Sequence, residues 1–138
     1  TRKNARWRKT TNEDEIISWL SNNFKTEIFE PENLSINQQL DMLGRTKFFF
    51  AAGASIPFSM FLPKDSVFFE IRPPKGHGVV GRCWADMFRF GYHKLETKWN
   101  EEDIKLKNFH EQDITIKMDK LISDVSKIVE LTGLIKKK

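Results

Sequence analysis

Apolar residues near the start of the chain recur at three- and four-residue intervals, the spacing of one face of a helix. The pattern follows Asn12, a residue type that caps helix N-termini, and the three acids after it would face the positive end of the helix dipole. Glu15 stands three residues after Asn12, as in a capping box. The helix predicted here carries its apolar residues at Ile16, Ile17, Trp19, Leu20 and Phe24.

Two continuous apolar runs, at residues 47–51 and 66–71, predict strands. A run without polar interruptions is typical of strands that are covered on both faces, as in parallel sheets. Small residues and a short helix at 54–61 separate the two runs. The middle of the chain is therefore predicted to be a strand–helix–strand unit.

Further elements continue this alternation of strands and helices. A short strand at 26–30 precedes Pro31, and a capping box of Ser35 and Gln38 begins a helix that Gly44 ends. Strands that alternate with helices predict an α/β fold, here a Rossmann-like parallel sheet flanked by helices. Downstream we expect a helix at 82–91, a strand at 92–96, a loop at 97–113, and a helix that is striped from Met118 to Val129 and terminated by Gly133.

Length and composition favour one domain over residues 1–138. Hydrophobic residues make up 39% of the chain and charged residues 30%, which is enough for a core and a solvated surface. No apolar run approaches the roughly 20 residues that cross a bilayer, so we expect neither a membrane span nor a targeting segment in this chain. The single cysteine, Cys83, excludes an internal disulfide, and we expect it to be buried.

Basic residues are unevenly placed in a chain of net charge +4. They crowd the first nine positions, and three lysines close the chain. Such runs are either solvated ends or a site for phosphates of a nucleotide or a nucleic acid. A nucleic-acid-binding module is therefore one alternative function. We expect no nucleic-acid partner, because the sequence has no helix-turn-helix and no RNA-recognition signature.

Residues 51–55, Ala-Ala-Gly-Ala-Ser, form the predicted turn between a strand and a helix, which is where parallel α/β sheets bind ligands. Gly53 permits a tight turn, and the N–H groups of Ala54 and Ser55 would point out of the helix N-terminus, an arrangement that suits a phosphate. The next strand ends on Glu70, whose carboxylate can accept hydrogen bonds from a ribose. Close packing at the turn and a solvated Glu70 fit the same pattern.

The order of these motifs resembles glycosyltransferase family 61 over about residues 1–95. The family pattern has two arginines, an Asn-Glu helix start, a Ser-x-x-x-Gln helix, an apolar strand, His-Gly-Ala, a Phe-Leu-Pro turn and a strand that ends in Glu. In this sequence the motifs fall on Arg2 and Arg8, Asn12-Glu13, Ser35 with Gln39, residues 47–51, Ala52-Gly53-Ala54, Phe61-Leu62-Pro63 and Glu70.

The resemblance implies a GT-B architecture, in which two Rossmann-like halves enclose a nucleotide sugar. This chain would be the donor-binding half, and its partner would be the N-terminal half of the same enzyme. Residues 52–55 would bind the diphosphate, Glu70 would bind the ribose, and Arg2 and Arg8 would neutralise the leaving diphosphate. The implied donor is a UDP-sugar, the acceptor is a protein or glycan hydroxyl, and the compartment is the Golgi or endoplasmic reticulum lumen. We expect no metal, because the sequence has no Asp-x-Asp pair.

The sequence departs from the family pattern at Ala52, where the family has His, and at Ser55, where it has Gly. Loss of that His leaves open a catalytically inactive interaction domain. The sequence identifies no catalytic base for the acceptor hydroxyl. We expect ordinary loop or surface histidines at His77, His93 and His110. We expect core side chains at Trp84, Met87, Phe88 and Phe90.

Overall fold

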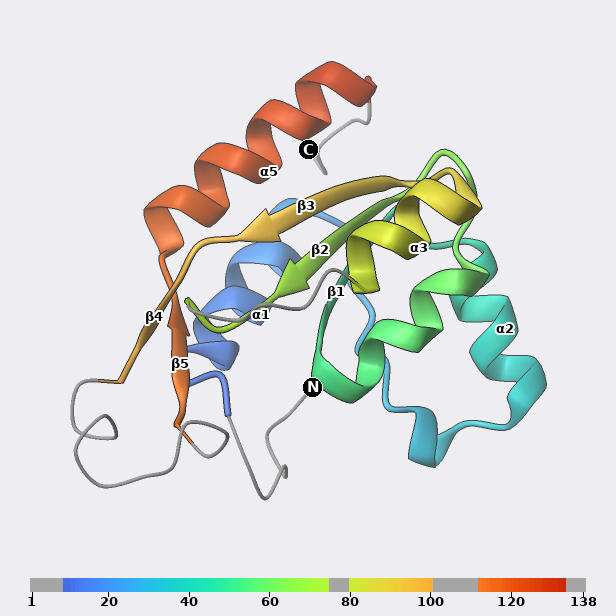
Figure 1. The fold of residues 1–138 in the computed structure, drawn as a ribbon, viewed down its shortest axis with the longest axis horizontal. Coiled ribbons are helices and arrows are strands. Elements are labelled where there is room, and N and C mark those ends of the chain that lie inside the picture. Colours follow the sequence, from blue (N-terminus) through green and yellow to red (C-terminus); the bar gives the residue numbers. More distant parts are fainter. Residues whose placement is uncertain (1–8, 75–79, 101–111, 134–138) are drawn as a thin grey trace. The chain divides into compact units, whose positions relative to one another are not determined.

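The computed structural model describes residues 9–74, 80–100 and 112–133 of the chain (Figure 1). The chain divides into two compact units. Phe29–Leu95 form one of them, the continuous unit, and Thr1–Ile28 with Glu96–Lys138 form the other, the discontinuous unit. A single domain over residues 1–138 stays a prediction.

The continuous unit is built on a parallel three-stranded sheet in the order β1-β2-β3. β2 is the central strand, and its Phe68 and Phe69 are both fully buried although they point to opposite faces of the sheet. The uninterrupted apolar run predicted this burial correctly, and the predicted α/β class with a parallel sheet is confirmed. The strands are β1 (Phe48–Ala52), β2 (Val67–Ile71) and β3 (Gly91–Leu95).

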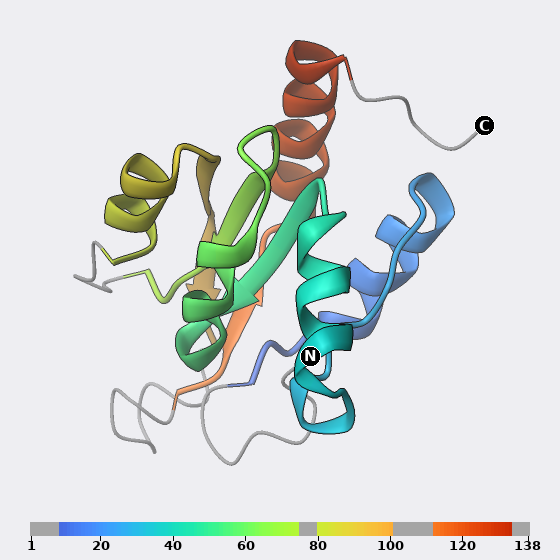
Figure 2. The same cartoon turned by 90° about the vertical axis from the view of Figure 1, so that its right-hand side faces the viewer.

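Three helices cover one face of this sheet (Figure 2). They are α2 (Ile36–Gly44), the 3-10 helix η2 (Gly53–Phe61) and α3 (Val80–Phe88). Leu43 of α2, Phe68 of β2 and Ala85 of α3 belong to one core cluster, against which Phe58 of η2 packs. Two parallel connections that step the same way across a sheet leave their helices on the same face. η2 and α3 are these two connections, and they also pack against each other.

The N-terminal cap of α2 is the one that the sequence predicts. The Gln38 N–H donates to the Ser35 hydroxyl, and the Gln38 side-chain oxygen accepts from the Ser35 N–H. The helix ends at Gly44, also as predicted. This local signal was reliable because all of its groups lie within four residues of each other.

The strand predicted at 26–30 is wrong. These residues join no sheet, and a 3-10 helix, η1 (Pro31–Asn33), follows them. Phe29 packs edge to face on Phe49 and Phe58 instead, with ring centroids 6.0 and 5.0 Å away. The apolar residue Phe29 is thus anchored by aromatic packing and does not belong to a strand.

Helix α3 turns its smallest residues toward the sheet. Gly81 and Ala85, one turn apart, are both buried. A Cβ atom built on Gly81 would lie only 3.0 Å from the Phe68 ring. The small residues therefore let α3 lie close to β2.

The larger residues of α3 consequently face away from the sheet. Met87 is 69% exposed and Phe88 is 37% exposed, so the prediction that they are core residues is wrong. Cys83 is exposed as well, which corrects the expectation that it is buried. The core prediction is confirmed at Phe90, which is 5% exposed, while Trp84 is only half-buried.

The discontinuous unit has a small sheet of its own, an antiparallel pair of β4 and β5. Residues 9–11 run parallel to β5: the Ile114 N–H donates to the Lys9 carbonyl at 3.0 Å, and the Thr11 N–H donates to the Ile114 carbonyl at 2.9 Å. The loop predicted at 97–113 is wrong at its start, because β4 occupies the first three of these residues. The elements are α1 (Glu13–Asn23), β4 (Thr97–Trp99), β5 (Ile114–Ile116) and α5 (Met118–Thr132). Both helices were predicted, including the end of α5 at Gly133 with φ +66°.

Asn12 continues this small sheet with its side chain. Its amide nitrogen donates to the Ile116 carbonyl at 2.9 Å, and its amide oxygen accepts from the Ile116 N–H at 3.0 Å. The side-chain amide thus takes the place of one more backbone pair along β5, just before α1 begins. Asn12 is the N-cap residue of α1, as predicted, but its side chain makes no capping hydrogen bond.

Candidate functional site

The carboxyl ends of β1 and β2 bring the predicted turn and the predicted glutamate together. Ala51 lies opposite Glu70 in the strand register, and Ala52 lies opposite Ile71. Gly53 follows the end of β1 directly, within the same unit. Ligands of parallel α/β proteins bind beyond this edge of the sheet.

The turn at Gly53 has the tight geometry that the sequence predicts. Gly53 has φ +55°, in the left-handed region that residues with a Cβ atom seldom adopt, while Ala52 before it is extended. Helix η2 begins at Gly53 itself, so the first N–H groups of the helix have no partners inside it. Ala52, the residue before the turn, is buried.

Glu70 is buried, with 2% of its surface exposed, which excludes the solvated alternative. Its carboxylate forms a bidentate pair with Arg72, whose Nε lies 2.9 Å from Oε1 and whose Nη2 lies 2.6 Å from Oε2. The Tyr92 hydroxyl donates to Oε2 at 2.6 Å. A buried carboxylate needs such compensation for the water it has lost. A ribose hydroxyl would have to compete with these donors to reach Glu70.

Tyr92 reaches Glu70 from the neighbouring strand. The register of β2 and β3 sets Tyr92 opposite Phe68, one side chain before Glu70 on the same face. The Tyr92 ring packs edge to face on Phe68 with centroids 6.1 Å apart, which aims its hydroxyl along β2. We call Glu70, Arg72 and Tyr92 the carboxylate cluster.

The sequence patterns predict no role for Arg72 or Tyr92. Strand alternation could have found Arg72, because it stands two residues after Glu70 and shares its face. Nothing local could have found Tyr92, since its place beside Glu70 depends on the register of β3. The cluster therefore became visible only with the fold.

The model of the family described as Glycosyltransferase 61 matches residues 1–69, which is 69 of the 138 residues. The chain belongs to glycosyltransferase family 61. Members of this family transfer glycosyl groups, so this family 61 chain works with a sugar donor and an acceptor. The matched residues include the turn at Gly53, and Glu70 comes directly after them. No curated protein and no solved structure matches the chain.

The remaining site residues of this family 61 chain are placed as follows. Arg2, Arg8, His77 and His110 lie outside the described residues. Ala54 and Ser55 lie in η2, and His93 lies in β3 with its ring 5.6 Å from that of Phe69. Within the described ranges, no three His, Cys, Asp or Glu side chains are grouped as metal ligands would be. None of the described helices has the length and apolarity needed to cross a membrane.

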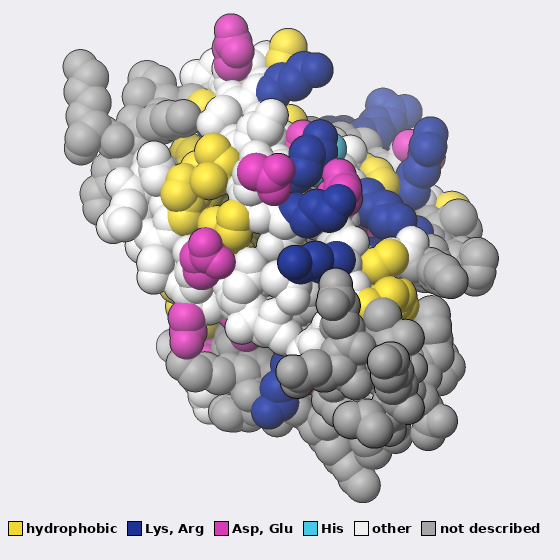
Figure 3. Space-filling view, turned by 90° about the vertical axis from the view of Figure 1, so that its left-hand side faces the viewer, with side chains coloured by type: hydrophobic (Ala, Val, Ile, Leu, Met, Phe, Trp, Pro, Cys, Tyr) yellow, Lys and Arg dark blue, Asp and Glu magenta, His cyan; other side chains and the backbone are white. Residues whose placement is uncertain are grey.

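Charged side chains of both signs are mixed on the face of the family 61 chain drawn in Figure 3. Within the discontinuous unit, Lys117 pairs with Glu96, and Lys120 lies 3.7 Å from the Asp124 carboxylate.

Gly81 gives the Glu70 carboxylate its space beneath the first turn of α3. A Cβ atom at Gly81 would lie 2.6 Å from Oε2 of Glu70, so we expect Gly81→Ala to lower the free energy of unfolding by about 1–3 kcal/mol. Urea denaturation measures this change. Gly44→Ala is the matched control: a Cβ atom there meets nothing within 4 Å, and alanine is the better helix former. Equal stability of Gly81→Ala and the wild type would contradict the packing of the carboxylate against α3.

Tyr92 is the single tyrosine of the chain, so its ionisation can be followed by phenolate absorbance. Burial, then the hydrogen bond to Glu70 and the negative charge of Glu70, raise the pKa of Tyr92 to about 12. An ordinary tyrosine, with a pKa of about 10, would be mostly ionised at pH ~11, whereas we expect Tyr92 to stay protonated in the native protein. Because the folded pKa is the higher one, the stability that this hydroxyl contributes is complete below pH ~10 and lost between pH ~10 and ~12.

Glu70→Gln is the control for this titration. It removes the negative charge beside the phenol, so the pKa of Tyr92 should move down toward its ordinary value. Phenolate that forms near pH ~10 in the folded wild type would show that the Tyr92 hydroxyl does not donate to Glu70.

Proposed function

We propose that this chain is the donor-binding part of a GT-B glycosyltransferase, which transfers a sugar from a UDP-sugar to a hydroxyl group of a protein or glycan. The observation that carries the proposal is the register that sets Ala51 against Glu70, because it places the Gly53 turn and the carboxylate cluster at adjacent strand ends of a family 61 chain. The second Rossmann-like half, and a place in the Golgi or endoplasmic reticulum lumen, belong to the same proposal by family resemblance.

The diphosphate of the donor would lie at the carboxyl edge of the sheet. Helices η2 and α3 each follow a strand end, so both helix N-termini are at this edge, where N–H groups and the helix dipole favour an anion. The N–H groups of Gly53, Ala54 and Ser55 would bind the phosphates, and Arg2 and Arg8 would add positive charge. Stabilising the diphosphate makes it a better leaving group.

Transfer also requires a base that takes the proton of the acceptor hydroxyl as the oxygen attacks the anomeric carbon. Ala52 offers no titratable group where the family has His. We therefore assign donor binding to residues 52–55 and Glu70, and the base to another part of the complete enzyme.

Calorimetric titration with UDP and with GDP tests the proposal. We expect UDP to bind in the micromolar to low-millimolar range and to bind more tightly than GDP. Gly53→Ala should abolish this binding, because alanine resists the left-handed conformation of the turn. Gly133→Ala is the matched control: Gly133 has a similar φ of +66°, yet it ends α5 in open space. The proposal is contradicted if neither UDP nor GDP binds, or if UDP binds the Gly53→Ala variant as tightly as it binds the wild type.

A further inference from the structure

We infer that Arg72 binds the diphosphate of the donor, and that Glu70 and Tyr92 are positioning residues that hold its guanidinium. The inference rests on the proposed function, because the diphosphate is that of the nucleotide sugar. It changes the role of Glu70 from a ribose ligand to the support of a phosphate ligand.

Accessibility distinguishes the two charged members of the carboxylate cluster. The Glu70 side chain is 3% exposed, whereas the Arg72 side chain is 13% exposed. Both carboxylate oxygens already accept hydrogen bonds, from Nε and Nη2 of Arg72 and from the Tyr92 hydroxyl. A ligand that approaches the cluster therefore meets the guanidinium more readily than the carboxylate.

The cluster fixes the orientation of the guanidinium. Two parallel hydrogen bonds to Glu70 set its plane, and Nη2 also lies 3.4 Å from the Tyr92 oxygen. A guanidinium carries N–H donors on more than one edge, so a fork that is held by a carboxylate on one edge can donate to an anion from another. A preoriented arginine loses less conformational freedom on binding than a mobile one.

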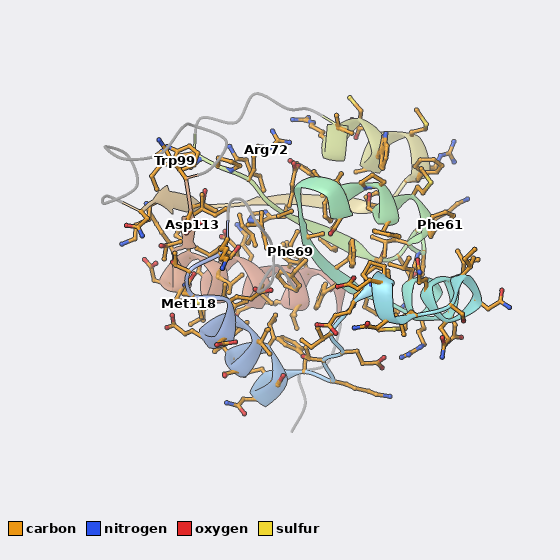
Figure 4. All side chains as sticks on the ribbon, turned by 90° about the horizontal axis from the view of Figure 1, so that it is seen from below. Phe61, Phe69, Arg72, Trp99, Asp113 and Met118 are labelled. Atoms are coloured by element: carbon orange, nitrogen blue, oxygen red, sulfur yellow. The ribbon has the colours of Figure 1, made fainter. Side chains whose placement is uncertain are left out.

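The position of Arg72 also suits a diphosphate. Arg72 comes directly after β2 as Gly53 comes directly after β1, and these strands are neighbours in register. Figure 4 shows Arg72 beyond the strand end, whereas Phe69 lies over the sheet. Gly81, in the first turn of α3, lies beside Glu70 of the same cluster, since a Cβ atom built on it would be 2.6 Å from Oε2. The cationic side chain and two helix N-termini therefore share one edge of the continuous unit.

The test is calorimetry on the 138-residue chain with UDP, 2′-deoxy-UDP, uridine and inorganic pyrophosphate. We expect Arg72→Gln to weaken UDP and pyrophosphate about 10- to 100-fold and to leave uridine unchanged. Wild-type protein should bind 2′-deoxy-UDP as tightly as UDP. Tyr92→Phe, which removes only the hydroxyl that holds Oε2, should weaken UDP and pyrophosphate about 2- to 5-fold and leave uridine unchanged.

Two further variants keep the test decisive. Arg72→Lys retains a cation beside Glu70, so it protects the fold, but it cannot form the fork and should still weaken pyrophosphate about tenfold. Arg45→Gln is the matched control. Arg45 pairs with Asp41 at 3.3 Å and precedes β1, so it lies at the opposite edge of the sheet, and all four affinities should be unchanged.

Each departure from these results has one meaning. If UDP binds the Arg72→Lys or Arg72→Gln variant as tightly as it binds the wild-type protein, Arg72 does not bind the diphosphate. The proposed function is unaffected by that result. If the wild-type protein binds UDP about tenfold or more tightly than 2′-deoxy-UDP, the inferred roles of Arg72 and Glu70 are overturned in favour of ribose binding by Glu70. Arg72-dependent binding of pyrophosphate without UDP binding supports the anion site and contradicts the proposed function. Failure of UDP and pyrophosphate to bind overturns both.

Discussion

Replacing Glu70 by alanine is expected to lower the free energy of unfolding by about 3–5 kcal/mol. The substitution leaves the Arg72 guanidinium, only 13% exposed, without the carboxylate that compensates its lost hydration. It also removes the acceptor of the Tyr92 hydroxyl. Urea denaturation at neutral pH measures the loss. If the slope of unfolding free energy against urea concentration is unchanged, the variant and the wild type undergo the same unfolding transition.

The double substitution Glu70→Leu with Arg72→Met is the control for this prediction. Replacing both members of a buried ion pair by apolar residues of similar volume is often close to neutral, so the double variant should be more stable than Glu70→Ala alone. A cost below about 1 kcal/mol for Glu70→Ala would mean that the pair behaves like an exposed one.

Asn12→Ala is expected to lower the free energy of unfolding by about 2–3 kcal/mol. Asn12 satisfies both the N–H and the carbonyl of Ile116, and Ile116 is buried, so the alanine variant leaves two backbone groups without these partners. Asn12→Asp should cost at least as much, because a carboxylate oxygen would then face the Ile116 carbonyl. Thermal and urea unfolding measure these losses.

Asn23 provides a matched control at the other end of α1. Its side chain makes one hydrogen bond, from Nδ2 to the Trp19 carbonyl at 2.8 Å, so Asn23→Ala should cost only about 1 kcal/mol. If Asn12→Ala costs no more than Asn23→Ala, the side chain of Asn12 does not act as a member of the small sheet.

Elements with local signals could be predicted from the sequence. The capping box of Ser35 and Gln38, the left-handed Gly133 and the apolar run of β2 each depend on a few neighbouring residues, and each is confirmed. The strands β4 and β5 were missed because each has three residues, too few for a periodic pattern, and their pairing joins Thr97 to Ile116.

The surroundings of Glu70 could be predicted only in part. The sequence places the residue at a strand end but does not show that α3 lies over it. That cover depends on Gly81 and Ala85 facing inward, although Met87 and Phe88 are larger and more apolar. Periodicity favours the apolar face of a helix for the core, whereas here the space between helix and sheet selects the small face. Burial of the carboxylate then requires Arg72 and Tyr92.

The division of the chain has a consequence for the order of folding. The continuous unit can complete its contacts within residues 29–95, whereas Asn12 and Ile116 are 104 positions apart. Closing a flexible loop of that length has a length-dependent entropic cost of about 4 kcal/mol, and a segment that has already folded within the loop shortens its flexible part. The small sheet should therefore form last and open first. Its amides at Thr11, Ile114 and Ile116 should exchange with solvent faster than those at the centre of β2.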